Sequence, residues 1–195
     1  MNLPQINLRS KSGHKALYDD DEYENNLRSS VKNKLVIWKS CQEIFPNEDL
    51  VILPENLDYS CFKQGNIGDC YFISCIHALS EIPQLLNYIF LLLTEEQNNQ
   101  VTLDQENFKV NFFIDGEWKI INIKNSFPIE IIKNDETGET KEVLLGVEPN
   151  KNELFLMILE KAWAKINGGY DKIEGGNIYN IFELFLGCKV ILIMN

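Results

Sequence analysis

The spacing of apolar residues changes along this chain, and that change restricts the fold more than any other feature. Residues 69–79 place apolar side chains on one face of a helix, and Pro83 ends that helix. Apolar residues alternate instead from 107 to 123, around the hairpin signal Asp115-Gly116. Helical spacing occupies three further blocks, at about 84–94, 152–166 and 178–186. The pattern predicts an α+β fold, mainly helical, with one β-hairpin.

The two ends of the chain differ from its middle. Residues 1–33 carry an acidic cluster without apolar periodicity, so we expect a flexible acidic extension. One domain is expected over residues 34–195, with its core beginning near Leu35 and a short strand at 143–147 after a polar loop. The apolar run Val190 to Met194 has no turn or polar exit, and this predicts a truncated domain.

Composition excludes several classes of partner and cofactor. The net charge of −11 repels nucleic-acid phosphates and anionic lipid, and the longest dense apolar run, Leu85 to Leu93, is far shorter than the ~20 residues of a membrane span. The five cysteines form no zinc-type spacing with either histidine, and nothing suggests a prosthetic group. Free thiols and the lack of an apolar leader predict a cytoplasmic protein.

The segment from Gln64 to Cys70 carries the strongest chemical signal. Cys70 stands at the start of a predicted helix, where unpaired N–H groups and the helix dipole favour a thiolate. The Cys70 N–H and the Gln64 amide can form an oxyanion hole, and Gly65 and Gly68 allow the tight approach that this needs. A lone cysteine is more often a buried apolar residue. The spacing of Gln, two glycines, Asp and Cys favours a nucleophile.

At this point the residues resemble a known family. The segment QGNIGDCYFISCIHALSEIP is similar to the active-site cysteine segment of the calpain family, whose fold is related to that of papain. Ile37-Trp38-Lys39 resembles the entry segment, LEKAWAKINGGY the long second helix, and Glu174-Gly175-Gly176 the glycine loop. The similarity covers about 34 to 190, the first of the two halves of the protease core, which we call catalytic subdomain 1.

The resemblance implies roles for five residues. Cys70 matches the nucleophile and Gln64 the oxyanion-hole amide, while Gly175 and Gly176 match glycines that pair with an extended protein or peptide substrate. Glu153 falls where the family has one calcium ligand, so calcium is the expected cofactor. The family's other acidic ligand position holds Cys61, a poor ligand for calcium, and Asp58 is its possible substitute.

The histidine and asparagine of the family lie on the second half of its core, beyond residue 195. His77 stands seven residues after Cys70, about 10.5 Å along the helix, and cannot act as its base. We therefore expect little hydrolysis by this chain alone. Three hypotheses remain: an endopeptidase half completed by a second segment or chain, a non-catalytic module that binds peptides or proteins, and a fragment that does not fold alone.

Overall fold

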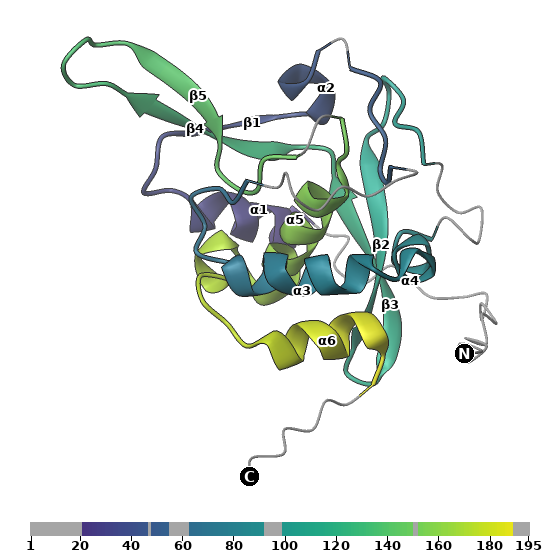
Figure 1. The fold of residues 1–195 in the computed structure, drawn as a ribbon. Coiled ribbons are helices and arrows are strands. Elements are labelled where there is room, and N and C mark those ends of the chain that lie inside the picture. The colour runs from purple at the N-terminus through teal and green to yellow at the C-terminus, as the bar shows by residue number, and fades with distance from the viewer. Residues whose placement is uncertain (1–20, 47, 55–62, 92–98, 150–151, 189–195) are drawn as a thin grey trace.

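A computed structural model describes residues 21–46, 48–54, 63–91, 99–149 and 152–188 (Figure 1). Its α-helices are α1 (Asp21–Ser30), α2 (Cys41–Ile44), α3 (Cys70–Ser80), α4 (Pro83–Ile89), α5 (Phe155–Asn167) and α6 (Ile178–Leu186), with a 3-10 turn, η2 (Tyr170–Lys172). Its strands are β1 (Val36–Lys39), β2 (Asn107–Ile114), β3 (Glu117–Lys124), β4 (Phe127–Lys133) and β5 (Thr140–Leu144). The predicted α+β class is confirmed.

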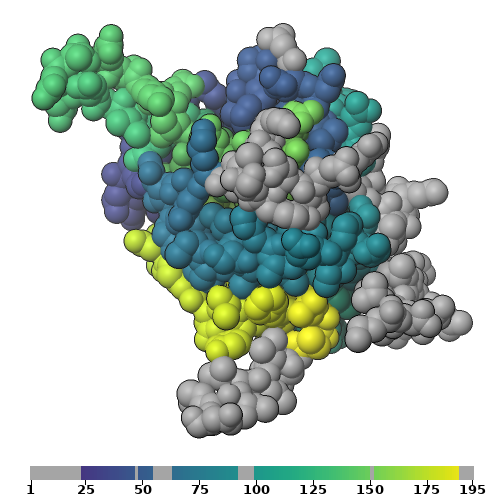
Figure 2. Space-filling view, in the orientation of Figure 1, coloured from purple at the N-terminus to yellow at the C-terminus, as the bar shows by residue number. Residues whose placement is uncertain are grey.

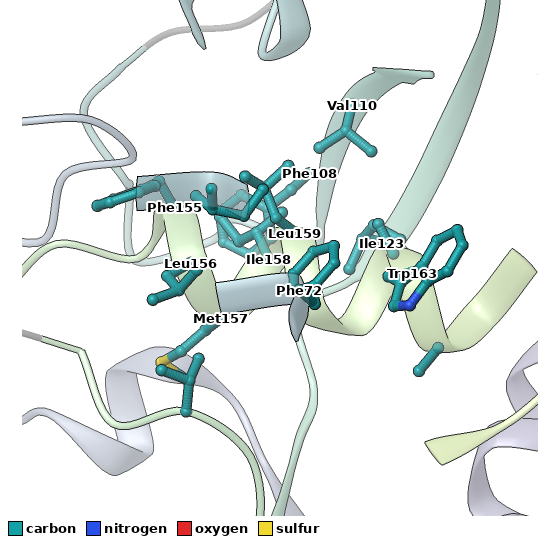
Figure 3. Close-up of a cluster of buried hydrophobic side chains, with 14 of the residues drawn as sticks. Phe72, Phe108, Val110, Ile123, Phe155, Leu156, Met157, Ile158, Leu159 and Trp163 are labelled. Atoms are coloured by element: carbon teal, nitrogen blue, oxygen red, sulfur yellow. The ribbon is translucent and has the colours of Figure 1, made fainter. Parts of the chain in front are cut away.

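Helix α5 forms the centre of the domain. Every residue from Phe155 to Lys165 is buried, because the helix is apolar on most of its surface and the other elements surround it. Figure 3 shows its side chains packed between Phe72 of α3 and Phe108 and Val110 of β2. The helix ends where Gly168 takes the left-handed conformation, with φ of 90°. The helical spacing at 152–166 predicted this helix.

Helix α3 lies across the front of α5 in the view of Figure 1, with α6 beside it. Its buried face carries Phe72, Cys75, Ile76 and Leu79 at helical spacing. The Phe72 ring stacks on Trp163 of α5, with centroids 6.0 Å apart and planes 8° apart. The packing therefore fixes the position and direction of the helix that begins at Cys70.

Strands β2 and β3 form the predicted hairpin. They pair antiparallel from Asn107 with Lys124 to Ile114 with Glu117. Asp115 and Gly116 make the turn with φ of 54° and 81°, and positive φ at both central positions is typical of a type I′ hairpin turn. The alternating pattern of the sequence places Phe108, Val110 and Phe112 in the core, all fully buried.

A second sheet, with strand order β1-β4-β5, was only partly predicted. The short strand expected at 143–147 runs instead from Thr140 to Leu144, and its partner β4 was not predicted. The outer parts of β4 and β5 pack against no other layer, so their sequence carries no core-facing pattern. They form an arm that projects from the body in Figure 2.

The expectation of a flexible extension through residue 33 is wrong for its last part. Residues 21–30 form α1, which packs on α5 with Leu27 fully buried. Glu24 of α1 forms a buried ion pair with Lys161 of α5, at 3.1 Å between Oε1 and Nζ. The sequence did not predict this helix, because its segment is short and polar. The burial of Glu24 depends on Lys161, a charged partner more than 130 residues away.

Two other expectations concern chain segments near the ends of elements. Helix α4 begins at Pro83 as predicted but ends at Ile89. The rest of the predicted 84–94 helix, from 92 on, and the apolar run Val190 to Met194 lie outside the described residues. Within the described ranges, no helix is both long and apolar enough to cross a membrane.

Candidate functional site

Cys70 is the first residue of α3, and its side chain is exposed. Its backbone N–H is among the first four of the helix, which have no partner inside the helix. Asp69 holds the N-cap position of α3, but its side chain makes no cap hydrogen bond. The site thus presents a thiol at the same helix end as an N–H that has no backbone partner among the described residues.

Gln64 folds back toward the start of α3. Its side-chain Nε2 donates to the carbonyl oxygen of Ile67 at 3.0 Å, and the Asp69 N–H donates to the same oxygen at 2.8 Å. One carbonyl therefore joins the Gln64 side chain to the residue before Cys70. The motif brings its two predicted catalytic residues, Gln64 and Cys70, to the same short loop.

The loop rests directly on the chain that follows β5. A Cβ on Gly65 would lie 1.9 Å from the carbonyl oxygen of Gly146, so only glycine fits there. The Asn66 N–H donates to the Leu145 carbonyl at 2.9 Å, and the Glu148 N–H donates to Lys63 at 2.9 Å. The close approach predicted for Gly65 is thus a contact between two backbones.

A pair of buried carboxyl groups lies on the inner side of the motif. Asp69 is fully buried, and Glu160 of α5 accepts the Val147 N–H on both oxygens, at 3.0 and 3.1 Å. Burial raises the pKa of Asp69 to about 6, and burial with the Asp69 charge raises the pKa of Glu160 well above its usual value.

Gly175 and Gly176 lie on the other side of Cys70. Gly175 has φ of 68°, and its N–H donates to the Gly68 carbonyl at 2.9 Å. Gly176 sits against Tyr71, since a Cβ there would lie 2.3 Å from the ring. Among the described residues, no backbone hydrogen bond uses the N–H or carbonyl of Gly176. Of the two glycines, Gly176 is the one with both backbone groups available to an extended peptide.

A hollow of about 470 Å³ opens beside the Gln64 end of the site. Its apolar lining includes Ile44, Phe45 and Ile129, and its rim includes Lys39 and Lys141. Gln64 and Gly65 also line it, so the hollow is continuous with the predicted oxyanion donor. A bound peptide that crosses Cys70 could extend an apolar side chain into this space.

The predicted calcium ligand does not meet other ligands among the described residues. Glu153 is 6% exposed and lies beside Val51 in an isolated bridge. In the described part of the chain, no group of three or more His, Cys, Asp or Glu side chains could hold a metal ion. Cys61 and Asp58 lie outside the described residues. The donors that are described do not by themselves fit the oxygen-rich set that calcium prefers.

His77 lies near the far end of α3 from Cys70, in agreement with the sequence prediction that it is no base for that thiol. It is the one histidine in the described ranges. Cys75, on the same helix, is 2% exposed and belongs to the core.

Sequence reasoning missed the functional neighbours that come from α5. Glu160, Lys161 and Lys165 are buried charged residues on a helix that is otherwise mostly apolar. Charged side chains at core positions of such a helix must have partners when they are buried. This signal was present in LEKAWAK, but the sequence could not identify the partners.

Comparison with known proteins gives the family. A family model described as "Calpain family cysteine protease" matches residues 14–194. The chain is 33% identical over 113 residues to the calpain-type cysteine protease DEK1 of Zea mays, which covers 58% of this chain and 4% of that protein. It is 28% identical over 159 residues to calpain-8 of Homo sapiens, covering 81% of this chain and 20% of that protein. The chain therefore spans a small part of each relative.

Proposed function

Because the chain belongs to the calpain family of cysteine proteases, we propose that it is the nucleophile-bearing half of an intracellular cysteine endopeptidase. The observation that carries the proposal is the loop in which the Ile67 carbonyl accepts from both the Gln64 side chain and the N–H of Asp69, the residue before Cys70. An exposed thiol at a helix start and an amide folded back beside it are the nucleophile and the oxyanion donor that peptide hydrolysis requires.

In the proposed reaction, the Cys70 Sγ attacks the carbonyl carbon of the scissile peptide bond. The oxyanion that forms accepts hydrogen bonds from the Cys70 N–H and from the Gln64 amide. One N–H of that amide is bonded to Ile67, and the second can point to the oxyanion. Gly176 pairs with the extended substrate, and the hollow beside Gln64 accepts a side chain across the scissile bond from it.

A base is needed to take the thiol proton and return it to the leaving amine. His77 is too far along α3 to do so. We propose that a second segment or chain carries the histidine and the asparagine that orients it. General-base assistance typically contributes ~10²- to 10⁴-fold, so the 195 residues alone should show little peptidase activity.

The experiment that tests this proposal compares two exposed thiols of the same chain. A peptidyl-epoxide reagent is added with and without a separately produced calpain-type second half, and modification of Cys70 and Cys188 is measured by mass spectrometry. The proposal predicts that the second half accelerates labelling of Cys70 but not of Cys188. Gln64→Ala should remove most of that gain. Equal labelling of the two thiols in every mixture would reject an endopeptidase half.

The hollow beside Gln64 supports a second candidate, a module that binds peptides or proteins without cleaving them. Ile132 lines the hollow and is 44% exposed, so Ile132→Arg should leave the fold intact. Loss of peptide binding in Ile132→Arg, with no effect of Cys70→Ser on binding or of the second half on labelling, would favour this candidate. Fluorescence anisotropy of a labelled peptide provides the measurement.

Calcium and compartment complete the proposal. We propose that calcium binds to Glu153 together with oxygen ligands outside the described residues. Calcium should then raise the melting temperature, and Glu153→Gln should abolish that rise.

The thiols of Cys41, Cys70, Cys75 and Cys188 are free. Free thiols of this number fit a reducing compartment such as the cytoplasm.

A further inference from the structure

The buried carboxyl pair, Asp69 and Glu160, connects the two parts of the Gln64–Cys70 motif. Asp69 precedes Cys70 directly and belongs to the loop that begins α3. Glu160 lies on α5 and faces that loop from the core, where it is 3% exposed. Neither carboxyl has a role in the proposed reaction. Their burial beside the reacting thiol therefore needs a separate explanation.

Glu160 supports the segment on which the Gln64 loop rests. Both of its oxygens accept the Val147 N–H, and a Cβ on Gly146 would lie 1.8 Å from Oε2. The carbonyl of Gly146 in turn touches Gly65, next to Gln64. A continuous line of contacts thus runs from the Glu160 carboxyl through 146–147 to the predicted oxyanion donor.

Asp69 forms the other end of this line. Within the described residues, both oxygens of its carboxyl are buried and have no hydrogen-bond partner of normal geometry. The groups that adjoin them are the Glu160 carboxyl and the backbone N–H of Asp69 itself. Two carboxylates repel each other, so this contact is a hydrogen bond only when one of the groups carries a proton.

The surroundings supply little to neutralise a second negative charge. The titratable groups around the pair include Tyr71 of α3, whose pKa is raised by burial and by Asp69, and Tyr170 of η2, whose pKa is raised by burial, by both carboxylates and by Glu24. Lys161, beside Glu160 in sequence, directs its ammonium to Glu24 of α1. Among the described residues, no ion pair of either carboxylate replaces the shared proton.

We propose that Glu160 is a positioning residue whose carboxyl, holding one proton in common with Asp69, keeps the Gln64 amide and the Cys70 helix in register. The inference rests on the proposed function, in which those two residues act on the same carbonyl group. When the proton leaves to solvent, two buried carboxylates remain side by side, and the loop and the helix start move apart.

The direction of the pH effect follows from the raised pKa of each carboxyl. The protonated folded form is favoured relative to the unfolded chain, so this stabilisation is fully present below pH about 4, the ordinary range of these groups. It falls as the pH rises through the raised values, about 6 for Asp69 and well above the ordinary value for Glu160. Between the two deprotonations the pair holds one proton.

The test uses nuclear magnetic resonance on the whole chain, without any peptidase assay. Carboxyl ¹³C shifts of Asp69 and Glu160 are followed from pH 3 to 10, together with the Val147 amide and the Gln64 side-chain amide. The proposal predicts carboxyl titrations well above the ordinary range and parallel shifts in both amides. In Glu160→Gln, whose amide can donate to Asp69 and accept from Val147, the amide shifts should vanish while the structure at pH 7 is kept. Glu174→Gln, an exposed acid beside Gly68, is the matched control and should change neither.

Each result decides the matter. Wild-type carboxyls that both titrate below pH about 5 would overturn the shared proton, and this measurement needs no variant to fold. Gln64 and Val147 amides that do not follow the carboxyls would overturn the positioning role, as would an unchanged pH profile in Glu160→Gln. A correct carboxyl titration alongside equal epoxide labelling of Cys70 and Cys188 would reject the endopeptidase and leave the coupling standing.

Discussion

Replacing Lys161 by methionine should destabilise the protein severely although the two side chains have similar shapes. The Lys161 ammonium is fully buried and donates to Glu24 at 3.1 Å and to the carbonyls of Lys124 and Ser126 at 3.0 and 2.7 Å. Burial lowers its pKa to about 8, so it remains charged at neutral pH. It thus joins α1, α5 and the connection between β3 and β4 through one charge.

The expected loss in the free energy of unfolding is about 3–5 kcal/mol, because the variant leaves Glu24 as a buried charge whose remaining ion pair in the described ranges is the longer one with Arg28, at 3.8 Å. The Ser126 carbonyl also loses a donor, whereas the Lys124 carbonyl keeps the Ser126 N–H at 2.7 Å, and this effect falls within the same range. This loss is at least a fifth of the ~5–15 kcal/mol by which a folded domain is stable. Urea unfolding followed by circular dichroism gives the value.

Two further variants make the measurement specific. Adding Glu24→Gln to Lys161→Met should recover part of the loss, since the unpaired charge is then removed. Lys172→Met breaks an exposed ion pair with Asp171 and should change little. A loss below about 1 kcal/mol in the single variant would refute the reasoning, because a buried ion pair of this kind cannot lose one partner so cheaply.

Three other substitutions test the site. Gly65→Ala should cost more than about 2 kcal/mol and slow epoxide labelling of Cys70, because its methyl would meet the Gly146 carbonyl; Gly138→Ala has open space and should cost about 1 kcal/mol for its positive φ. A melting curve identical to wild type for Gly65→Ala would contradict the contact. Gly176→Ala should displace the Tyr71 ring and lower the melting temperature by several degrees, and calorimetry would show it. Cys70→Ser should leave the melting temperature unchanged and abolish labelling at that position, as mass spectrometry can establish.

The parts of the fold that the sequence predicted are those with a local cause. The hairpin follows from alternation with Asp115-Gly116 between the strands, and α3, α5 and α6 follow from helical spacing with a proline or glycine near their ends. The close backbone approach at Gly65 also has a local cause, since only glycine leaves room for the Gly146 carbonyl there.

The parts that the sequence did not predict depend on partners far away in the chain. Helix α1 is held on α5 by the ion pair between Glu24 and Lys161. Strand β4 forms between β1 and β5, which pair with it on its two edges. Asp69 is a residue type that often caps helices, yet its side chain lies beside Glu160 and makes no cap hydrogen bond. The sequence of a short polar segment does not reveal a distant partner. Local propensity alone therefore predicted a flexible extension where α1 forms.

The arm formed by β4 and β5 offers a place to attach a label. Its tip, residues 134–139, is fully solvent-facing and lies beyond the last register pair, Lys133 with Thr140. The arm extends away from the body in Figure 2, so a dye or an affinity tag inserted at the tip would meet neither the core nor Cys70. Because β5 leads directly into the segment that supports the Gln64 loop, a fluorophore there would report events at the site from a position outside it.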